Sequence, residues 1–260
     1  MTNAAGVAYS TVHDVETISD DALRDLLAYP DGLRSPHLRA NFIASIDGAV
    51  TLRGSGRSLG TPTDRRVFAR LREVADVVLV GATTAAAAPY ADLHMSPEAS
   101  AWRASHGLGL DLPVAVVSSR GVIPPHLLTG ETVPPVVLVG DGADEAARRT
   151  LERSGARVTM IAGGRVSSAA IRGALAAAGL TRVLVEGGPT LFSQLVGDDE
   201  IDELCLTTSP KLVAGPARRI AASADHVEIT MERNGILIGA DGTVIVRWVR
   251  ARSPRSVGVS

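Results

Sequence analysis

Short apolar runs, each followed by a helical pattern, constrain the fold of this chain more than any other feature. Such runs lie at residues 77–80, 114–117, 136–139 and 183–185. A strand of a parallel sheet is buried on both faces, so it is apolar throughout, whereas a half-exposed strand alternates apolar and polar residues. The repeated succession of buried strand and helix therefore predicts an α/β fold, with a mostly parallel sheet and helices on both faces.

Capping residues mark the helices between these runs. Thr63 and Asp64 can cap a helix that runs to about Val74. Two further helices, over residues 143–154 and 167–178, are each followed by a glycine, the residue that most readily adopts the left-handed conformation at the end of a helix. The chain thus supplies helices of ordinary length to cover the sheet.

The end of the chain has a different pattern. Apolar stretches at residues 204–207, 226–229 and 244–249 follow one another with few helical signals between them. Strands joined without a crossover helix pair antiparallel. We therefore expect a mixed sheet, with an antiparallel edge formed by residues 240–250.

No internal repeat or low-complexity linker divides the chain, so we interpret residues 38–260 as one domain. Residues 1–37 are interpreted as an N-terminal extension. Within it, Asp20 or Asp21 can cap a short helix that ends before Pro30-Asp31-Gly32.

Composition excludes several classes of function. The net charge of -2 argues against nucleic acid or anionic membrane as a partner. A single cysteine, Cys205, rules out a disulfide framework, and the six histidines have no ligand spacing, so we expect no metal site. Neither a signal peptide nor an apolar stretch of about 18 residues is visible, which predicts a soluble cytoplasmic protein.

The strongest local signal of a binding site is the segment Val183-Leu-Val-Glu186-Gly187-Gly188-Pro189-Thr190-Leu191. Pro189 takes the favoured first position of a helix, and two glycines let a phosphate approach the backbone at the helix N-terminus. Ligands of a parallel sheet bind outside the carboxyl ends of its strands, where Glu186 can accept a hydrogen bond from a ring N–H. The alternative is a structural connection with a surface glutamate.

A second segment reads Asn41-Phe-Ile-Ala44-Ser45-Ile46-Asp47-Gly48. Aspartate and glycine after a strand are typical of a tight turn. Asp47 becomes a candidate functional carboxylate only through the other motifs that accompany it.

Taken together, the motifs resemble the reductase domain of the bifunctional riboflavin-biosynthesis deaminase/reductases, over about residues 38–250. The segments that carry the resemblance are Ala44-Ser-Ile-Asp-Gly48, Asp64-Arg-Arg-Val-Phe-Ala-Arg-Leu-Arg72, Ala75-Asp-Val-Val-Leu-Val-Gly81 with Thr84, Val185-Glu-Gly-Gly-Pro-Thr-Leu191, and Ile201-Asp-Glu-Leu-Cys-Leu206 with Pro210. The resemblance implies a dihydrofolate-reductase-like three-layer fold. It also implies an NADPH-dependent reductase of 5-amino-6-(5-phosphoribosylamino)uracil or a closely related pyrimidine.

The resemblance further implies roles for individual residues, position by position. Ile43 and Ala44 are implied to line the nicotinamide region, and Thr84 and Ser119 to bind the dinucleotide. The residues implied to surround the cofactor diphosphate are Gly187, Gly188, Pro189, Thr190 and Leu191. Asp47 and Glu186 are the implied catalytic residues, and Ser58, Arg72 and Glu186 are the implied substrate contacts. Related proteins often carry a cis peptide between the two glycines, and they pair as homodimers through closely spaced apolar strands like those at the end of this chain.

Two expectations come from residue chemistry. Arg120 follows Ser119 and is our candidate for the 2′-phosphate of NADPH, because a guanidinium binds phosphate at two points; the alternative is a solvated loop arginine. A carboxylate in an apolar pocket has a raised pKa, which would let it protonate the nitrogen of a C=N bond that receives a hydride.

The chain also departs from the family. Ala88 occupies the position of an acidic residue, and the arginine that helps to hold the substrate phosphate is missing after Pro89. The zinc deaminase motifs are absent, so deamination by that route is excluded. Three interpretations stay open: a ribosylamino-pyrimidine reductase, a pterin reductase such as a dihydrofolate reductase, and a non-catalytic NADPH sensor. The presence of both Asp47 and Glu186 argues against the sensor.

Overall fold

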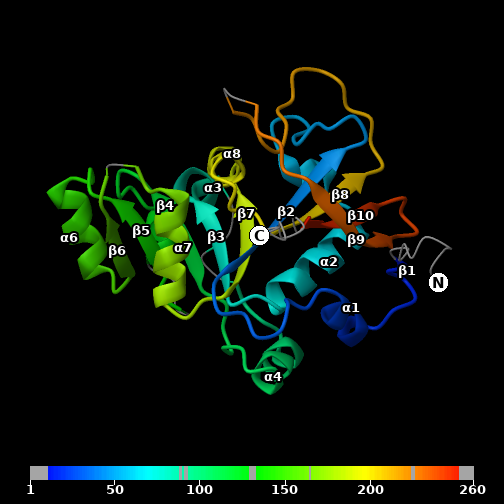
Figure 1. Cartoon of the computed structure of the whole chain (residues 1–260), viewed down its shortest axis with the longest axis horizontal. Helices are drawn as coiled ribbons and strands as arrows, with labels where there is room; N and C mark the ends of the chain where they lie inside the picture. The colour runs from blue at the N-terminus through cyan, green and yellow to red at the C-terminus, as the bar shows by residue number, and fades with distance from the viewer. Residues whose placement is uncertain are drawn as a thin grey trace, which may run out of the picture.

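A computed structural model describes residues 11–87, 90, 93–128, 133–163, 165–223 and 226–251. Within them, one ten-stranded sheet has the order β1-β9-β10-β8-β2-β7-β3-β4-β5-β6 (Figure 1). The strands are β1 (Val12–Asp14), β2 (His37–Ser45), β3 (Val77–Gly81), β4 (Val114–Ser118), β5 (Val136–Gly140), β6 (Arg157–Ile161), β7 (Arg182–Gly187), β8 (Glu203–Ser209), β9 (Met231–Ile238) and β10 (Val244–Arg250).

The sheet is mixed and mostly parallel, as the apolar runs predict. From β8 to β6 in this order, every neighbouring pair of strands is parallel. Strand β10 is antiparallel to both β8 and β9, and β1 is parallel to β9. The predicted antiparallel pairing is confirmed, but the predicted edge is wrong: β10 lies inside the sheet, and β1 forms that edge.

The prediction of a strand at residues 226–229 is also wrong, because the strand in this region, β9, begins at Met231. Val244 lies opposite Ile238, so the hairpin turn fixes the register and pairing extends back to Met231. The segment Glu232-Arg233-Asn234 within β9 is exposed and polar. This polar first half of β9 gives no apolar signal, and its pairing with β10 defines it instead.

The described helices are α1 (Asp20–Leu26), α2 (Pro62–Glu73), α3 (Ala82–Ala87), α4 (Pro97–Ser105), α5 (Pro125–Leu128), α6 (Glu145–Arg153), α7 (Ser168–Ala177) and α8 (Pro189–Gly197), with a short 3-10 helix at Gly56–Leu59. Side-chain caps start several of these helices, namely α1, α2, α4, α6 and α7. The predicted cap of α2 is two residues late, since Thr61 accepts the hydrogen bond from the Asp64 N–H and Pro62 takes the first helical position. Among the helices that the structure describes, none combines the length and apolar character needed to cross a bilayer.

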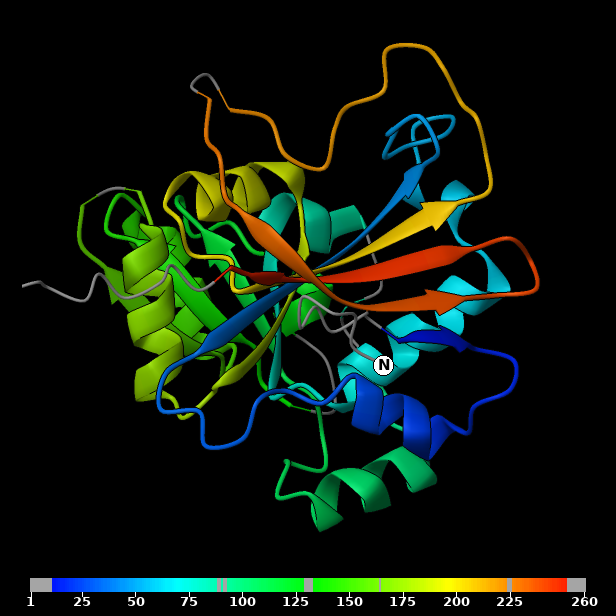
Figure 2. The same cartoon turned by 45° about the vertical axis from the view of Figure 1, so that its right-hand side comes forward.

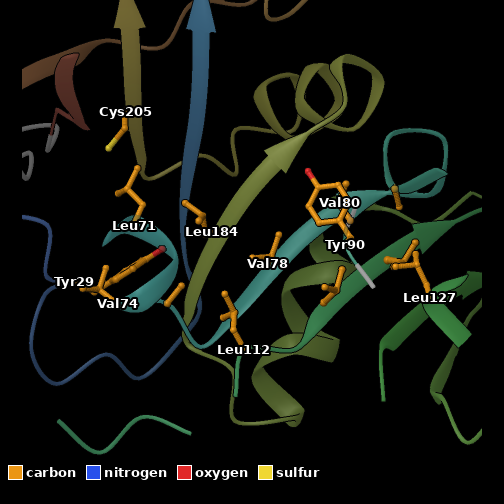
Figure 3. Close-up of a cluster of buried hydrophobic side chains, with 14 of the residues drawn as sticks. Tyr29, Leu71, Val74, Val78, Val80, Tyr90, Leu112, Leu127, Leu184 and Cys205 are labelled. Carbon is orange, nitrogen blue, oxygen red and sulfur yellow. The ribbon is translucent and has the colours of Figure 1, made fainter. Parts of the chain in front are cut away.

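Helices cover both faces of the sheet, which confirms the predicted layers. Leu71 of α2 and Leu151 of α6 pack on one face, in the cluster that Figure 3 shows around Val78 and Leu184. Side chains from α7 and α8 pack on the other face, where Leu79, Val183 and Val185 point. Alternate residues of each central strand thus enter opposite clusters, so the parallel strands are buried on both sides.

The segment before β2 is built into this architecture. Strand β1 pairs with β9, and Leu23 and Leu27 are fully buried against α2. Asp20 forms ion pairs with Arg66 and Arg70 of α2. These contacts hold α1 on the outer face of α2.

Candidate active site

The carboxyl ends of the parallel strands meet at one edge of the sheet, and a cavity of about 870 Å³ lies there. It lies beside the first turn of α8, the start of α3 and the loop between β4 and α5. Many predicted cofactor contacts line it together: Thr84, Ser119, Arg120, Gly188, Pro189, Thr190 and Leu191. Residues from three separate segments of the sequence therefore share one cavity.

The two glycines of β7 and α8 face crowded surroundings. Gly187 has a φ of +96°, a conformation that side chains disfavour, and the Gly187–Gly188 peptide is cis. A Cβ built on Gly188 would lie 2.1 Å from Oγ1 of Thr84. Thr84 and Gly188 thus form a close contact across the base of the cavity, where only glycine fits.

Helix α8 begins at this contact without a side-chain cap. Its N-cap residue, Gly188, offers no side chain to the first turn. The N–H groups of Thr190 and Leu191 have no acceptor within the helix, and they add to the positive end of the helix dipole. This first turn can bind an anion that enters the cavity.

Glu186 lies on the other face of β7, beside α2. Its carboxylate accepts hydrogen bonds from Nε and a terminal nitrogen of Arg72, both at 2.7 Å, and its side chain is only 3% exposed. The Arg72 guanidinium stacks on Phe68 at 4.2 Å. Burial and, after it, the Glu186 carboxylate raise the pKa of Tyr90. Two predicted substrate contacts therefore form one ion pair at the end of a strand.

Asp47 is exposed at the turn after β2 and holds a loop. Its carboxylate accepts hydrogen bonds from the Ser45 hydroxyl at 2.5 Å and from the backbone N–H groups of Val213 and Ala214 at 3.1 and 2.7 Å. These donors lower the pKa of Asp47 to about 2. The expected raised pKa is wrong for this residue, because its surroundings supply hydrogen bonds instead of an apolar wall.

The remaining predicted residues lie around the same edge. Ile43 and Ala44 lie near the end of the pairing between β2 and β8, and Ala44 is buried. Ser58 is exposed in the 3-10 helix, where its carbonyl accepts a hydrogen bond from Nζ of Lys211. Ala88 and Pro89, which mark the departure from the family pattern, lie outside the described residues.

The residues that line the cavity without having been predicted include His126, Gln194 and Arg218. Gln194 lies one helical turn after Thr190, so it shares a face of α8 with the predicted motif, and that spacing could have identified it. Arg218 lies in a loop without a recognisable motif. A second cavity of about 600 Å³ runs along α8 and shares Pro189, Thr190, Gln194 and Arg218 with the first.

A parallel sheet with an uncapped helix start at its carboxyl edge defines an α/β ligand-binding protein. The family model of the RibD C-terminal domain matches residues 36–245, and the chain belongs to this family. The resemblance deduced from the motifs is thereby confirmed.

Two archaeal relatives carry the name 2,5-diamino-6-ribosylamino-4(3H)-pyrimidinone 5′-phosphate reductase. The protein of Methanothermobacter thermautotrophicus is 28% identical over 196 residues, which are 74% of this chain and 86% of that protein. The protein of Archaeoglobus fulgidus is 27% identical over 183 residues, or 69% of this chain and 83% of that protein.

Solved structures share the fold. A pyrimidine reductase-like protein from Corynebacterium diphtheriae superimposes with a TM-score of 0.75 at 21% identity, covering 89% of this chain and 99% of that one. RibD of Acinetobacter baumannii gives a TM-score of 0.64 at 18% identity, covering 84% of this chain and 59% of the longer RibD chain. The predicted fold class is confirmed.

Proposed function

We propose that this protein is an NADPH-dependent reductase of 5-amino-6-(5-phosphoribosylamino)uracil or a closely related ribosylamino-pyrimidine. The observation that carries the proposal is the cavity at the uncapped start of α8, in a chain of the RibD C-terminal domain family. The printed names of two relatives, which are pyrimidine reductases, support the substrate class.

The reaction converts a ribosylamino group into a ribitylamino group. NADPH, when bound, supplies a hydride to C1′ of the ring-opened ribosyl group. The electron pair of the C=N bond would then move to nitrogen, which would take up a proton from solvent. The protein binds and orients the partners.

The residues present fit a dinucleotide. The helix start at Thr190 and Leu191 provides N–H donors for a diphosphate, and Gly188 leaves room for it against Thr84. Arg120 is exposed on the cavity wall and has no ion pair with another described residue. It is the proposed contact of the 2′-phosphate, which supports NADPH over NADH.

The ion pair of Glu186 and Arg72 is the proposed substrate contact. A carboxylate can accept about four hydrogen bonds, so Glu186 keeps lone pairs for a ring N–H of the pyrimidine. Arg72 keeps one terminal nitrogen of its guanidinium free of Glu186, able to donate to a carbonyl or phosphate oxygen. Asp47, with a pKa of about 2, is a carboxylate at neutral pH and can orient the substrate but not donate a proton.

The test follows NADPH absorbance with each of two substrates, the ribosylamino-pyrimidine and dihydrofolate. The proposal expects oxidation of NADPH with the pyrimidine and formation of the ribitylamino product by mass spectrometry. Oxidation with dihydrofolate alone would instead identify a pterin reductase. Binding of NADPH without turnover of either would favour the non-catalytic sensor.

We also propose a homodimer formed through the face of β8, β9 and β10 opposite α2. In β8 the buried positions include Glu203 and Thr207, while Leu204 and Leu206 face outward and are only half-buried. On β10, Val246 lies opposite Leu206 and Trp248 lies opposite Leu204, and Ile236 of β9 lies opposite Val246 on its other side. An apolar sheet face of this kind supports an isologous contact.

The proposed cofactor and substrate are metabolites made inside the cell, which supports a cytoplasmic location.

A further inference from the structure

A loop after β8, residues 210–223, crosses from the end of that strand back toward α8 (Figure 2). We call this segment the crossing loop. Its first part is anchored at the turn after β2: the Ile46 N–H donates to the Lys211 carbonyl at 2.9 Å, and Asp47 accepts from Val213 and Ala214. The loop is therefore held against one side of the site.

The far part of the crossing loop is anchored on α8 itself. The Ala222 N–H donates to the Ser193 hydroxyl at 2.8 Å, and Ile220 and Ala221 pack against the cluster that contains Phe192. In between, the Arg218 carbonyl accepts a hydrogen bond from the Val50 N–H at 3.2 Å. The backbone of Arg218 is thus fixed between two anchors, although its side chain is exposed.

Arg218 lies where the two cavities join. It lines the larger cavity together with Gly188, Pro189 and Thr190, and it also lines the smaller cavity along α8. Its guanidinium forms no ion pair with any other described residue. Its neighbour Arg219 lines only the smaller cavity, which Thr84 does not line.

The charges of the larger cavity are arranged for a ligand with two separate phosphate groups. Its lining contains Arg120 and Arg218 and no aspartate or glutamate among the described residues. Arg120 is on the loop after β4, and Arg218 is beside the first turn of α8. The smaller cavity differs, because Asp198 accompanies its arginines. Two guanidinium groups on different segments, together with the free backbone N–H groups at the start of α8, match the charge of a phosphorylated dinucleotide.

We propose that Arg218 binds the diphosphate of the dinucleotide at the start of α8, while Arg120 serves the 2′-phosphate. This inference rests on the proposed function, since it assumes that the cavity takes NADPH. In the same inference Asp47 is a residue that positions Arg218, because the Asp47 carboxylate anchors the loop that carries Arg218. Neither role follows from the glycine motif, which contains no cation.

The two cofactors separate these roles, because NADPH and NADH share the diphosphate and only NADPH has the 2′-phosphate. Binding of each is measured by isothermal titration calorimetry to wild type, Arg218→Ala, Arg120→Ala and the matched control Arg219→Ala. Loss of one charged hydrogen bond weakens binding about ten- to a hundredfold. Arg218→Ala should show that loss for both cofactors, and Arg219→Ala should show it for neither.

Each contrary result has a distinct meaning. Wild-type affinity of Arg218→Ala for both cofactors would overturn the inference and leave the proposed function intact. A loss confined to NADPH would assign Arg218 to the 2′-phosphate and overturn the diphosphate role. A wild-type protein that binds neither cofactor would overturn the proposed function, and the inference with it. An equal loss in Arg219→Ala would show a general effect of surface charge and also overturn it.

Discussion

Arg72 and Glu186, 114 positions apart in the sequence, form a two-point ion pair with both N–O distances at 2.7 Å. The Glu186 side chain is nearly buried, whereas Arg72 is 23% exposed. The pair joins the end of strand β7, in the sheet, to helix α2, which covers one face of that sheet. Neither residue lines the cavity, so the pair holds the carboxyl end of β7 against α2.

Removal of one partner should leave an uncompensated charge. We expect Arg72→Ala to lower the free energy of unfolding by about 3 kcal/mol, the lower end for a buried pair, because Arg72 keeps some contact with water. The double variant Arg72→Met with Glu186→Gln should recover much of that loss. Urea denaturation measures both. As a matched control, Arg149→Ala breaks an exposed pair with Glu145 and should change the free energy by less than about 0.5 kcal/mol. Equal losses in the two alanine variants would contradict the expected difference.

Gly188 should not tolerate a side chain. In Gly188→Ala the new Cβ would meet Oγ1 of Thr84 at 2.1 Å, so one of the two segments must move away from the cavity. We expect NADPH affinity to fall by more than tenfold, or about 1.4 kcal/mol, while the melting temperature changes little. The double variant Gly188→Ala with Thr84→Ala removes the clashing hydroxyl and should regain part of the affinity. Wild-type affinity in the single variant would show that the cofactor binds elsewhere.

The hydrogen bonds of Asp47 should make the anchoring of the crossing loop depend on pH. Hydrogen bonds from Ser45, Ala214 and Val213 lower its pKa from 3.8 to about 2. A carboxyl group with a lowered pKa stabilises the folded state at pH values above its ordinary pKa, and this contribution is lost as the pH falls through the folded value. Amide hydrogen exchange at Val213 and Ala214 should therefore stay protected at pH 4 and above, relative to Asp47→Ala, and lose that protection toward pH 2. Protection that disappears between pH 7 and pH 5 would contradict the assigned anchor.

Local sequence predicts the elements that carry the site but not the contacts between distant segments. The buried strand before Glu186 and the helix start at Pro189 were predictable, because a strand covered on both faces is apolar throughout and proline suits the first turn of a helix. The pairing of Arg72 with Glu186 and of Asp47 with Val213 depends on segments more than a hundred positions apart, which only the fold brings together. Strand β9 escaped prediction for a related reason, since its first half is polar and exposed and is defined by pairing with β10.

The homodimer prediction rests on an inverted pattern in β8, where polar side chains face inward and leucines face outward. A partner would cover Leu206, Val246 and Trp248, which lie on one face of the sheet. Light scattering at micromolar concentration should give twice the 26.9 kDa mass of the chain. A charge in the centre of an apolar contact is strongly unfavourable, so Trp248→Glu should give the monomer mass.

The control for the dimer is Met160→Glu, which places the same charge on an exposed apolar residue of β6, at the opposite edge of the sheet. This variant should remain dimeric, because β6 lies far along the strand order from β8 and β10. Circular dichroism should show that both variants keep the wild-type secondary structure. A wild-type mass near 26.9 kDa would rule out the dimer. Dissociation of Met160→Glu together with a dimeric Trp248→Glu would place the contact at the β6 edge, where an unpaired strand can extend the sheet across two chains.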